Sequence, residues 1–148
     1  MRSLLTLLLT LTALASLLSV TSTVSADTLD TPAALQATTE RFLASAVDGQ
    51  LAEAYRALRP FLGVGQAPFD ASAREADSYF RRVAEQVGDP IGYSHVLTES
   101  IGEDFYRTVW LQKFDTAAIA WTFTFYQPRE GWKLVGVSYS TDLASLYR

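Results

Sequence analysis

Apolar residues recur at helical spacing in three stretches of the first half of the chain. These stretches lie within residues 32–47, 50–62 and 70–87, and a loop is expected over residues 63–68. A capping threonine and a proline precede the first stretch, and a glycine follows both the first and the third. Asp70 is interpreted as the cap of the third stretch. The pattern therefore predicts three helices.

After Pro90 the pattern changes to β-branched and aromatic residues separated by turn signals, which is typical of antiparallel strands. Strands are predicted at residues 92–101, 105–114, 117–127 and 132–140. The connecting segments are short enough to be hairpin loops, so consecutive strands should be neighbours. The sequence thus predicts an α+β fold in which three N-terminal helices pack on a four-stranded antiparallel meander.

Short loops also fix which side chains share a face of the sheet. The turn at residues 115–116 pairs Trp110 with Trp121, and the four-residue loop before the last strand places Gly136 opposite Phe123. One face then gathers Tyr106, Trp110, Phe114, Ile119, Trp121, Phe123, Phe125 and Trp132. The other carries His95, Leu97, Val109, Leu111, Ala120, Val135, Val137 and Tyr139. Both faces are largely apolar.

This register leaves one apolar face without a cover. Three helices can cover only one face of such a sheet, and a soluble domain rarely exposes more than about a few hundred Å² of continuous apolar surface. We therefore expect a homodimer formed through one sheet face. Val137 is predicted to lie in the middle of that uncovered face, and Phe123 in the core.

Residues 1–26 have the pattern of a secretory signal peptide. Arg2 is followed by an apolar stretch over residues 4–20 and by Val24-Ser25-Ala26, a small-residue cleavage site. A retained membrane anchor is the weaker alternative, because threonine and serine shorten the apolar span below the roughly 20 residues that a bilayer needs. We expect cleavage before Asp27, no membrane attachment after it, a single domain over residues 27–148, and a periplasmic or extracellular location.

Composition excludes several classes of function. The chain has no cysteine, which rules out thiol catalysis and thiolate zinc sites. Without residues 1–26, 11 Lys and Arg face 16 Asp and Glu, and this net charge of −5 disfavours nucleic acid as a partner. The acidic excess lies mostly in residues 27–89 and is interpreted as a solvated helical surface. One histidine and scattered carboxylates give no metal-site spacing, and no cofactor is expected.

The last predicted hairpin, residues 121–139, has Gly131-Trp132-Lys133-Leu134 at its turn exit. After a helical first half, this hairpin resembles the nuclear-transport-factor-2-like superfamily of cystatin-like α+β proteins, and most of all its small secreted bacterial members of unknown function. The resemblance implies a curved sheet that wraps the helices into a cone, whose open end often holds a small apolar ligand. Members include dehydratases, isomerases and pure binding or dimerisation modules, so the resemblance does not choose a function.

The aromatic residues that would form the wall of such a pocket are Tyr55, Tyr79, Trp110, Trp121 and Phe123. Core packing is nevertheless the favoured explanation for these aromatic side chains. His95 could act as a general base, but the predicted register places it away from the aromatic face, which favours a structural role. No catalytic residue is assigned.

The function that these observations favour is an exported, non-catalytic domain that binds a small apolar ligand or a protein partner. One alternative is a small lyase or isomerase that uses His95 or a pocket tyrosine. Another is a structural dimerisation module. A pair of polar groups held together inside a concave cavity would favour the enzyme, because acid–base chemistry needs two positioned groups.

Overall fold

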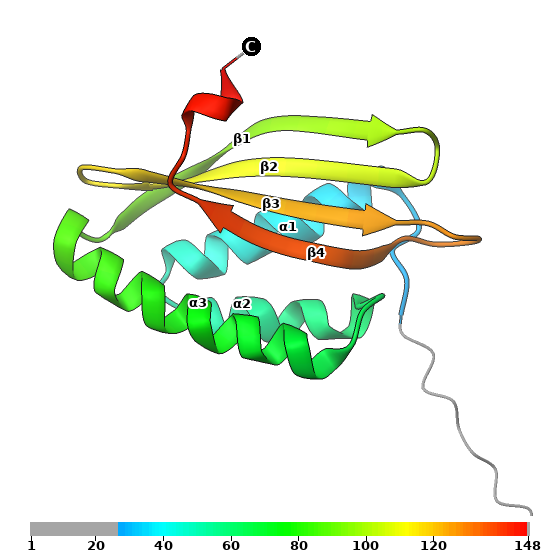
Figure 1. The fold of residues 1–148 in the computed structure, drawn as a ribbon, viewed down its shortest axis with the longest axis horizontal. Helices are drawn as coiled ribbons and strands as arrows, with labels where there is room; N and C mark the ends of the chain where they lie inside the picture. Colours follow the sequence, from blue (N-terminus) through cyan, green and yellow to red (C-terminus); the bar gives the residue numbers. More distant parts are fainter. Residues whose placement is uncertain (1–26, 148) are drawn as a thin grey trace, which may run out of the picture.

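The computed structural model describes residues 27–147, which form three α-helices and a four-stranded antiparallel sheet (Figure 1). The α-helices are α1 (Pro32–Val47), α2 (Leu51–Leu58) and α3 (Gln66–Val87). The strands are β1 (Pro90–Ile101), β2 (Phe105–Phe114), β3 (Ala118–Tyr126) and β4 (Lys133–Ser140), with short 3-10 helices η1 (Arg59–Phe61) and η2 (Ala144–Leu146). The α+β prediction is confirmed, and the predicted signal peptide lies outside the described residues.

Local capping signals explain where the helices begin. The Thr31 side chain accepts a hydrogen bond from the Ala34 N–H at 3.2 Å, and Pro32 occupies the first turn, as the sequence predicted for α1. The predicted start of α3 is wrong, because the helix begins at Gln66 and Asp70 lies inside it. Pro68 is tolerated in the first turn, since the N–H groups there have no acceptor within the helix.

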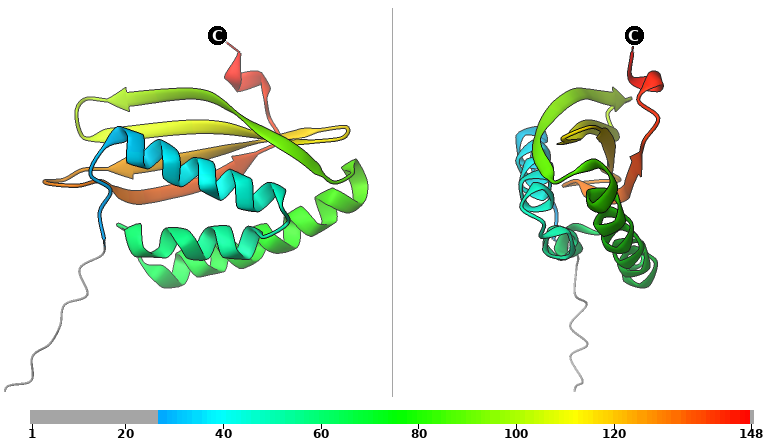
Figure 2. Two further views of the ribbon diagram at one scale, coloured as in Figure 1. Left: turned by 180° about the vertical axis from the view of Figure 1, so that it is seen from behind. Right: turned by 90° about the vertical axis from the view of Figure 1, so that its left-hand side faces the viewer.

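The strands follow one another in the order β1-β2-β3-β4, as the meander prediction required. The three helices lie on one side of this sheet (Figures 1 and 2). Between β2 and β3 the predicted register is confirmed, with Trp110 opposite Trp121 and Thr108 opposite Phe123. The turn at residues 115–116 is local, so it set this pairing reliably.

The predicted register between β3 and β4 is wrong beyond the first pairs. Phe125 pairs with Leu134 as expected, but a β-bulge follows, and Gly136 lies opposite Thr124 instead of Phe123. One extra residue moves every later side chain to the other face. Val137 therefore packs against the core with its neighbour Tyr139, and neither lies on the face opposite the helices.

The predicted placement of His95 is wrong, because β1 contains a second bulge. The shift between His95 and Leu97 puts His95 opposite Trp110, and the two ring centroids are 5.0 Å apart at 70°. His95 therefore lies on the face that carries the aromatic core, although its side chain is exposed there. Beyond the bulge, Leu97 pairs with Val109 on the opposite face, as predicted.

The core between helices and sheet is aromatic, and its polar atoms have partners. Phe42 of α1 touches the rings of Trp121 and Phe123 edge-on, with centroids 4.9 and 5.0 Å apart. The Trp121 indole N–H donates to the buried Gln112 Oε1 at 2.9 Å. A buried tryptophan usually needs such an acceptor, so this hydrogen bond fixes the ring orientation.

Candidate functional site

The five predicted pocket-wall residues occupy different environments. Trp110 is 3% exposed, while Trp121 and Phe123 are fully buried within the aromatic core. Tyr79 is half-buried on α3 and stacks on Tyr139 of β4, with ring centroids 5.2 Å apart. Of the five, Tyr55 alone lines any of the four cavities described below.

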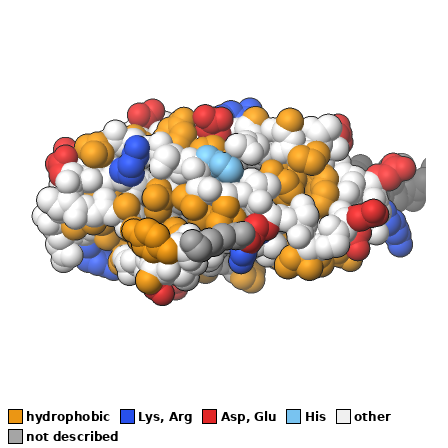
Figure 3. Space-filling model, turned by 90° about the horizontal axis from the view of Figure 1, so that it is seen from above, with side chains coloured by type: hydrophobic (Ala, Val, Ile, Leu, Met, Phe, Trp, Pro, Cys, Tyr) orange, Lys and Arg blue, Asp and Glu red, His pale blue; other side chains and the backbone are white. Residues whose placement is uncertain are grey.

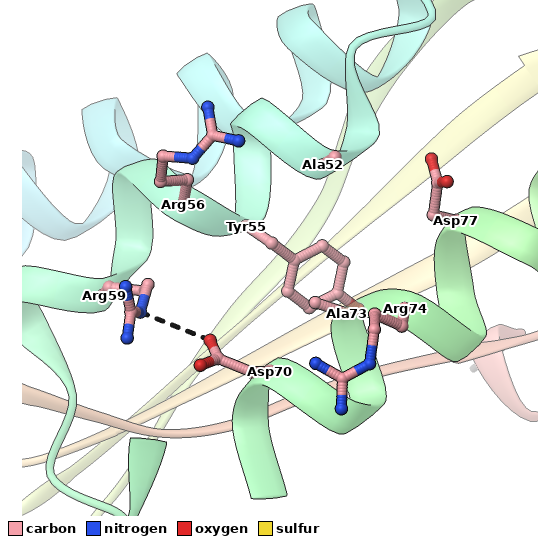
Figure 4. Close-up of a pocket in the computed structure, with 8 residues that line it drawn as sticks. All are labelled: Ala52, Tyr55, Arg56, Arg59, Asp70, Ala73, Arg74 and Asp77. Atoms are coloured by element: carbon pink, nitrogen blue, oxygen red, sulfur yellow. Dashed lines mark ion pairs between the residues drawn. The ribbon is translucent and has the colours of Figure 1, made fainter. Parts of the chain in front are cut away.

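A cavity of about 240 Å³ lies between α2 and α3 (Figure 4). Its lining residues are Ala52, Tyr55, Arg56, Arg59, Asp70, Ala73, Arg74 and Asp77. On each helix the charged or small side chains are three or four positions apart, which places them on one helix face. Ala52 and Ala73 leave the space between the helices open, because neither side chain extends beyond Cβ.

Tyr55 lies between the two helices in this cavity (Figure 4). Its side chain is 3% exposed, and its ring packs against Phe42 and Phe69 with centroids 5.2 and 5.4 Å away. Among the described residues, the Tyr55 hydroxyl has no hydrogen-bond partner, and because no fully buried side-chain polar atom there lacks one, this hydroxyl still reaches solvent at the cavity. Burial raises the pKa of Tyr55, and the nearby Tyr139 raises it further, so the phenol remains protonated.

Most charged side chains at the cavity are already paired. Asp70 forms an ion pair with Arg59, in which the Asp70 Oδ1 lies 3.2 Å from the Arg59 Nε. Arg56 pairs with Glu53, which lies outside the cavity. Asp77 pairs with Arg81, which also lies outside the lining, at 2.5 Å. Arg74 is the exception.

Arg74 is exposed, and within residues 27–147 it has no carboxylate at ion-pair distance. The other lining charges each have a partner of opposite sign. The cavity therefore presents one uncompensated positive charge and, from Tyr55, one hydroxyl donor.

A second cavity, of about 180 Å³, lies between the start of α3 and β4. Its lining is mostly apolar: Tyr55, Leu62, Val64, Pro68, Phe69, Ser72, Leu134, Val135, Gly136 and Val137. Tyr55 lines both cavities, so this residue lies where α2, α3 and β4 meet. The bulge in β4 shapes the second cavity, because it brings Val137 to this face.

Two larger hollows, of about 520 and 560 Å³, flank α1. Arg41 and Thr38 line both, and the Arg41 guanidinium donates to the Thr38 hydroxyl at 3.2 Å. Their polar side chains are thus engaged with each other. Neither hollow presents a buried polar group without a partner in the part of the chain that the structure describes.

His95 takes part in neither cavity beside Tyr55. Its Nε2 lies 2.9 Å from the Thr98 hydroxyl, with which it shares a hydrogen bond on β1. Within residues 27–147, no cluster of three or more histidine or carboxylate side chains is arranged to hold a metal ion. The same residues include no helix that is long and apolar enough to cross a bilayer.

The sequence prediction named Tyr55 as a pocket residue but did not name Arg74. The only available signal was that residues 52, 56 and 59 are spaced along the chain in the same way as residues 70, 74 and 77. That signal has meaning only once α2 and α3 are known to be neighbours. No family model, curated protein or solved structure matches the chain.

Proposed function

We propose that the protein is an exported, non-catalytic domain that binds a small, mainly apolar molecule beside Tyr55. The observation that carries this proposal is Tyr55, a residue that is 3% exposed, lines two cavities and turns to one of them a hydroxyl without a hydrogen-bond partner in the described chain. A ligand that accepts a hydrogen bond from this hydroxyl replaces water there, and one such bond contributes about 0.5–1.5 kcal/mol net.

The two cavities limit the size and polarity of the ligand. Their volumes, about 240 and 180 Å³, are below the roughly 300–1,000 Å³ of pockets for drug-sized molecules. In the first cavity Ala52, Tyr55 and Ala73 supply the apolar surface among five charged side chains, and the lining of the second cavity is mostly apolar. We infer a compact ligand with a flat or short apolar body.

The protonation of Tyr55 favours binding over catalysis. General acid–base chemistry is most efficient when a group changes its protonation state near the working pH. Burial raises the pKa of Tyr55 above its ordinary value of 10.0, so this phenol is a hydrogen-bond donor that keeps its proton. His95, the alternative base, is engaged with Thr98 outside this site.

The binding proposal predicts where small fragments contact the protein. In NMR titrations with a set of neutral and acidic aromatic fragments, we expect the largest shifts at the amides of Ala52, Tyr55 and Ala73. Tyr55→Phe should weaken the best fragment by about fivefold, which corresponds to one lost hydrogen bond. The matched control is Tyr147→Phe, because the Tyr147 side chain is 86% exposed. Shifts confined to other surfaces, or equal affinity in folded Tyr55→Phe, contradict the proposal.

Export and the cone-like arrangement of the nuclear-transport-factor-2-like superfamily are also part of the proposal. Both rest on sequence, the first on residues 1–26 and the second on the hairpin at residues 121–139. N-terminal sequencing of the protein from the extracytoplasmic fraction should begin at Asp27, within a residue or two. Intact Met1 in the membrane fraction would disprove cleavage.

A further inference from the structure

The charges around Tyr55 identify the chemical class of the ligand. We infer that the cavity between α2 and α3 binds a small monocarboxylate, whose carboxylate pairs with Arg74 and whose apolar body lies over the Tyr55 ring. This inference rests on the proposed function and adds the ligand class to it.

The first argument is the charge balance of the lining. Asp70 is paired with Arg59, and the other lining charges have partners outside the cavity. Arg74 alone has none among the described residues. One unpaired guanidinium matches one negative charge, and its planar N–H groups can donate two parallel hydrogen bonds to a carboxylate.

The lining carboxylates argue against more highly charged ligands. Asp70 and Asp77 line the same cavity as Arg74, and a dianion such as a phosphate monoester would be repelled by both once Arg74 is neutralised. A cation would instead meet the unpaired guanidinium. A monoanion is therefore the charge state that this lining fits.

The second argument is the position of the donor and the apolar surface. Figure 4 shows the Tyr55 ring between Arg59, at the start of η1, and Arg74 of α3. Ala52 and Ala73 flank this ring and leave room over it. A planar acid can thus lie against the ring while its oxygens face the N–H groups of Arg74 and the hydroxyl of Tyr55. A purely apolar ligand would leave these donors without an acceptor.

The exposure of Arg74 sets the expected strength. Ion pairs between exposed side chains contribute only about 0.2–1 kcal/mol and are screened by salt. The carboxylate should therefore improve affinity by about two- to fivefold over a neutral analogue. Raising the ionic strength should reduce this improvement.

The experiment compares sodium benzoate with benzamide, which has the same shape and no charge. In NMR titrations of the full chain at low ionic strength, benzoate should bind about two- to fivefold more tightly than benzamide. Arg74→Gln should bring the ratio of benzoate to benzamide affinity to about one, because only benzoate loses an ion pair. Arg82→Gln, on the same helix but outside the cavity lining, is the matched control and should preserve the difference.

A second variant tests the same charge balance in the opposite direction. Asp70→Asn removes the partner of Arg59, so the cavity gains an unpaired positive charge. Benzoate should then bind about two- to fivefold more tightly than to the wild type, while benzamide is unaffected. This variant keeps the inference testable if Arg74→Gln fails to fold.

Three results overturn the inference and leave the proposed function intact: equal binding of benzoate and benzamide to the wild type, equal binding of benzoate to all variants, or tighter binding of inorganic phosphate than of benzoate. If no fragment of any charge shifts the amides of Ala52, Tyr55 and Ala73, the proposed function itself fails, and the inference fails with it.

Discussion

The hydroxyl of Tyr55 is the residue-scale feature on which the binding site depends. Buried tyrosines and tryptophans usually place their polar hydrogen against an acceptor. The indole N–H of Trp110 does so. Tyr55 instead packs its ring on Phe42 and Phe69 and leaves the hydroxyl at a cavity. The ring stabilises the core, so the hydroxyl is free to serve binding.

We predict that Tyr55→Phe leaves the free energy of unfolding at neutral pH unchanged or slightly higher, because the hydroxyl has no partner to lose within the described chain. The two proteins should differ in alkali. Burial raises the pKa of Tyr55, so the folded state holds the phenol proton more tightly than the unfolded chain does. The resulting contribution to the free energy of unfolding is complete below the ordinary pKa of 10.0 and is lost as the pH rises above it. Urea unfolding at pH values from about 8 to about 11 should show a shallower alkaline loss for Tyr55→Phe.

Some alkaline loss should remain in Tyr55→Phe. Burial, and then the neighbouring Tyr79, raise the pKa of Tyr139 as well, so Tyr139 continues to disfavour the folded state at high pH. Identical alkaline profiles for wild type and variant would show that the Tyr55 phenol ionises as easily in the folded protein as in the unfolded one.

The hydrogen bond between Trp110 and Thr39 offers a contrasting case. The indole N–H donates to the Thr39 hydroxyl at 3.1 Å, and both side chains are at most 3% exposed. We predict that Thr39→Val, which keeps the shape, lowers the free energy of unfolding by about 1–3 kcal/mol because the indole donor loses its acceptor. Thr122→Val, at a half-buried position on the opposite sheet face, is the control. Equal urea midpoints for the two variants would contradict this role.

At the scale of elements, the junction between α3 and the β2–β3 hairpin constrains the fold. Gly88 follows α3 with φ +87° and ψ 179°, a conformation that glycine adopts almost exclusively. The Thr116 N–H of the hairpin donates to the Val87 carbonyl at 3.3 Å. A Cβ at Gly88 would overlap the Asp115 side chain, so a glycine allows the hairpin to approach the helix end.

We predict that Gly88→Ala destabilises the protein more than Gly49→Ala. Both glycines have positive φ, +87° and +75°, so each alanine would be held in a disfavoured backbone conformation at a cost of about 1–3 kcal/mol. A Cβ at Gly49 meets nothing within 4 Å, whereas at Gly88 it also displaces Asp115. Thermal unfolding of the two variants side by side measures the difference. Equal melting temperatures would mean that the hairpin moves away at no cost.

At the scale of the whole molecule, the bulge in β4 decides which apolar residues face the helices. Val137 packs against the core, while the half-buried Leu111 remains on the opposite face. That face is less open than predicted, because Val109 and Ala120 on it are only 3% and 4% exposed. Seen from above, hydrophobic side chains form separate groups among charged ones (Figure 3). The homodimer through this face stays a prediction.

We predict that Val137→Glu lowers the free energy of unfolding by about 1–3 kcal/mol, because Val137 is half-buried against the core and the new carboxylate would lose part of its solvation there. Leu111→Glu should leave the fold intact, because its face is opposite the helices. Circular dichroism measures folding, and sedimentation at matched concentration measures association. A Val137→Glu variant that is as stable as Leu111→Glu would contradict the observed register. A wild type that is already monomeric at micromolar concentration would contradict the dimer.

The sequence by itself determined the features that depend on neighbours in the chain. Helical periodicity, the cap at Thr31 and the short strand connections are local signals, and they predicted the α+β fold and the meander. The two-residue turn at residues 115–116 likewise determined the pairing of Trp110 with Trp121. Such signals act over a few residues, so they remain valid whatever the rest of the chain does.

Only the tertiary structure decided the features that depend on distant segments. The Gly63 N–H donates to the Leu134 carbonyl at 2.8 Å, and this contact holds the edge of β4 beside the bulge that turns Val137 inward. No hairpin loop encodes that contact. The cavity beside Tyr55 is of the same kind, because Arg74 becomes a lining residue only when α3 packs beside α2. Periodicity identifies the face of a helix, but packing between segments far apart in the sequence decides what that face meets.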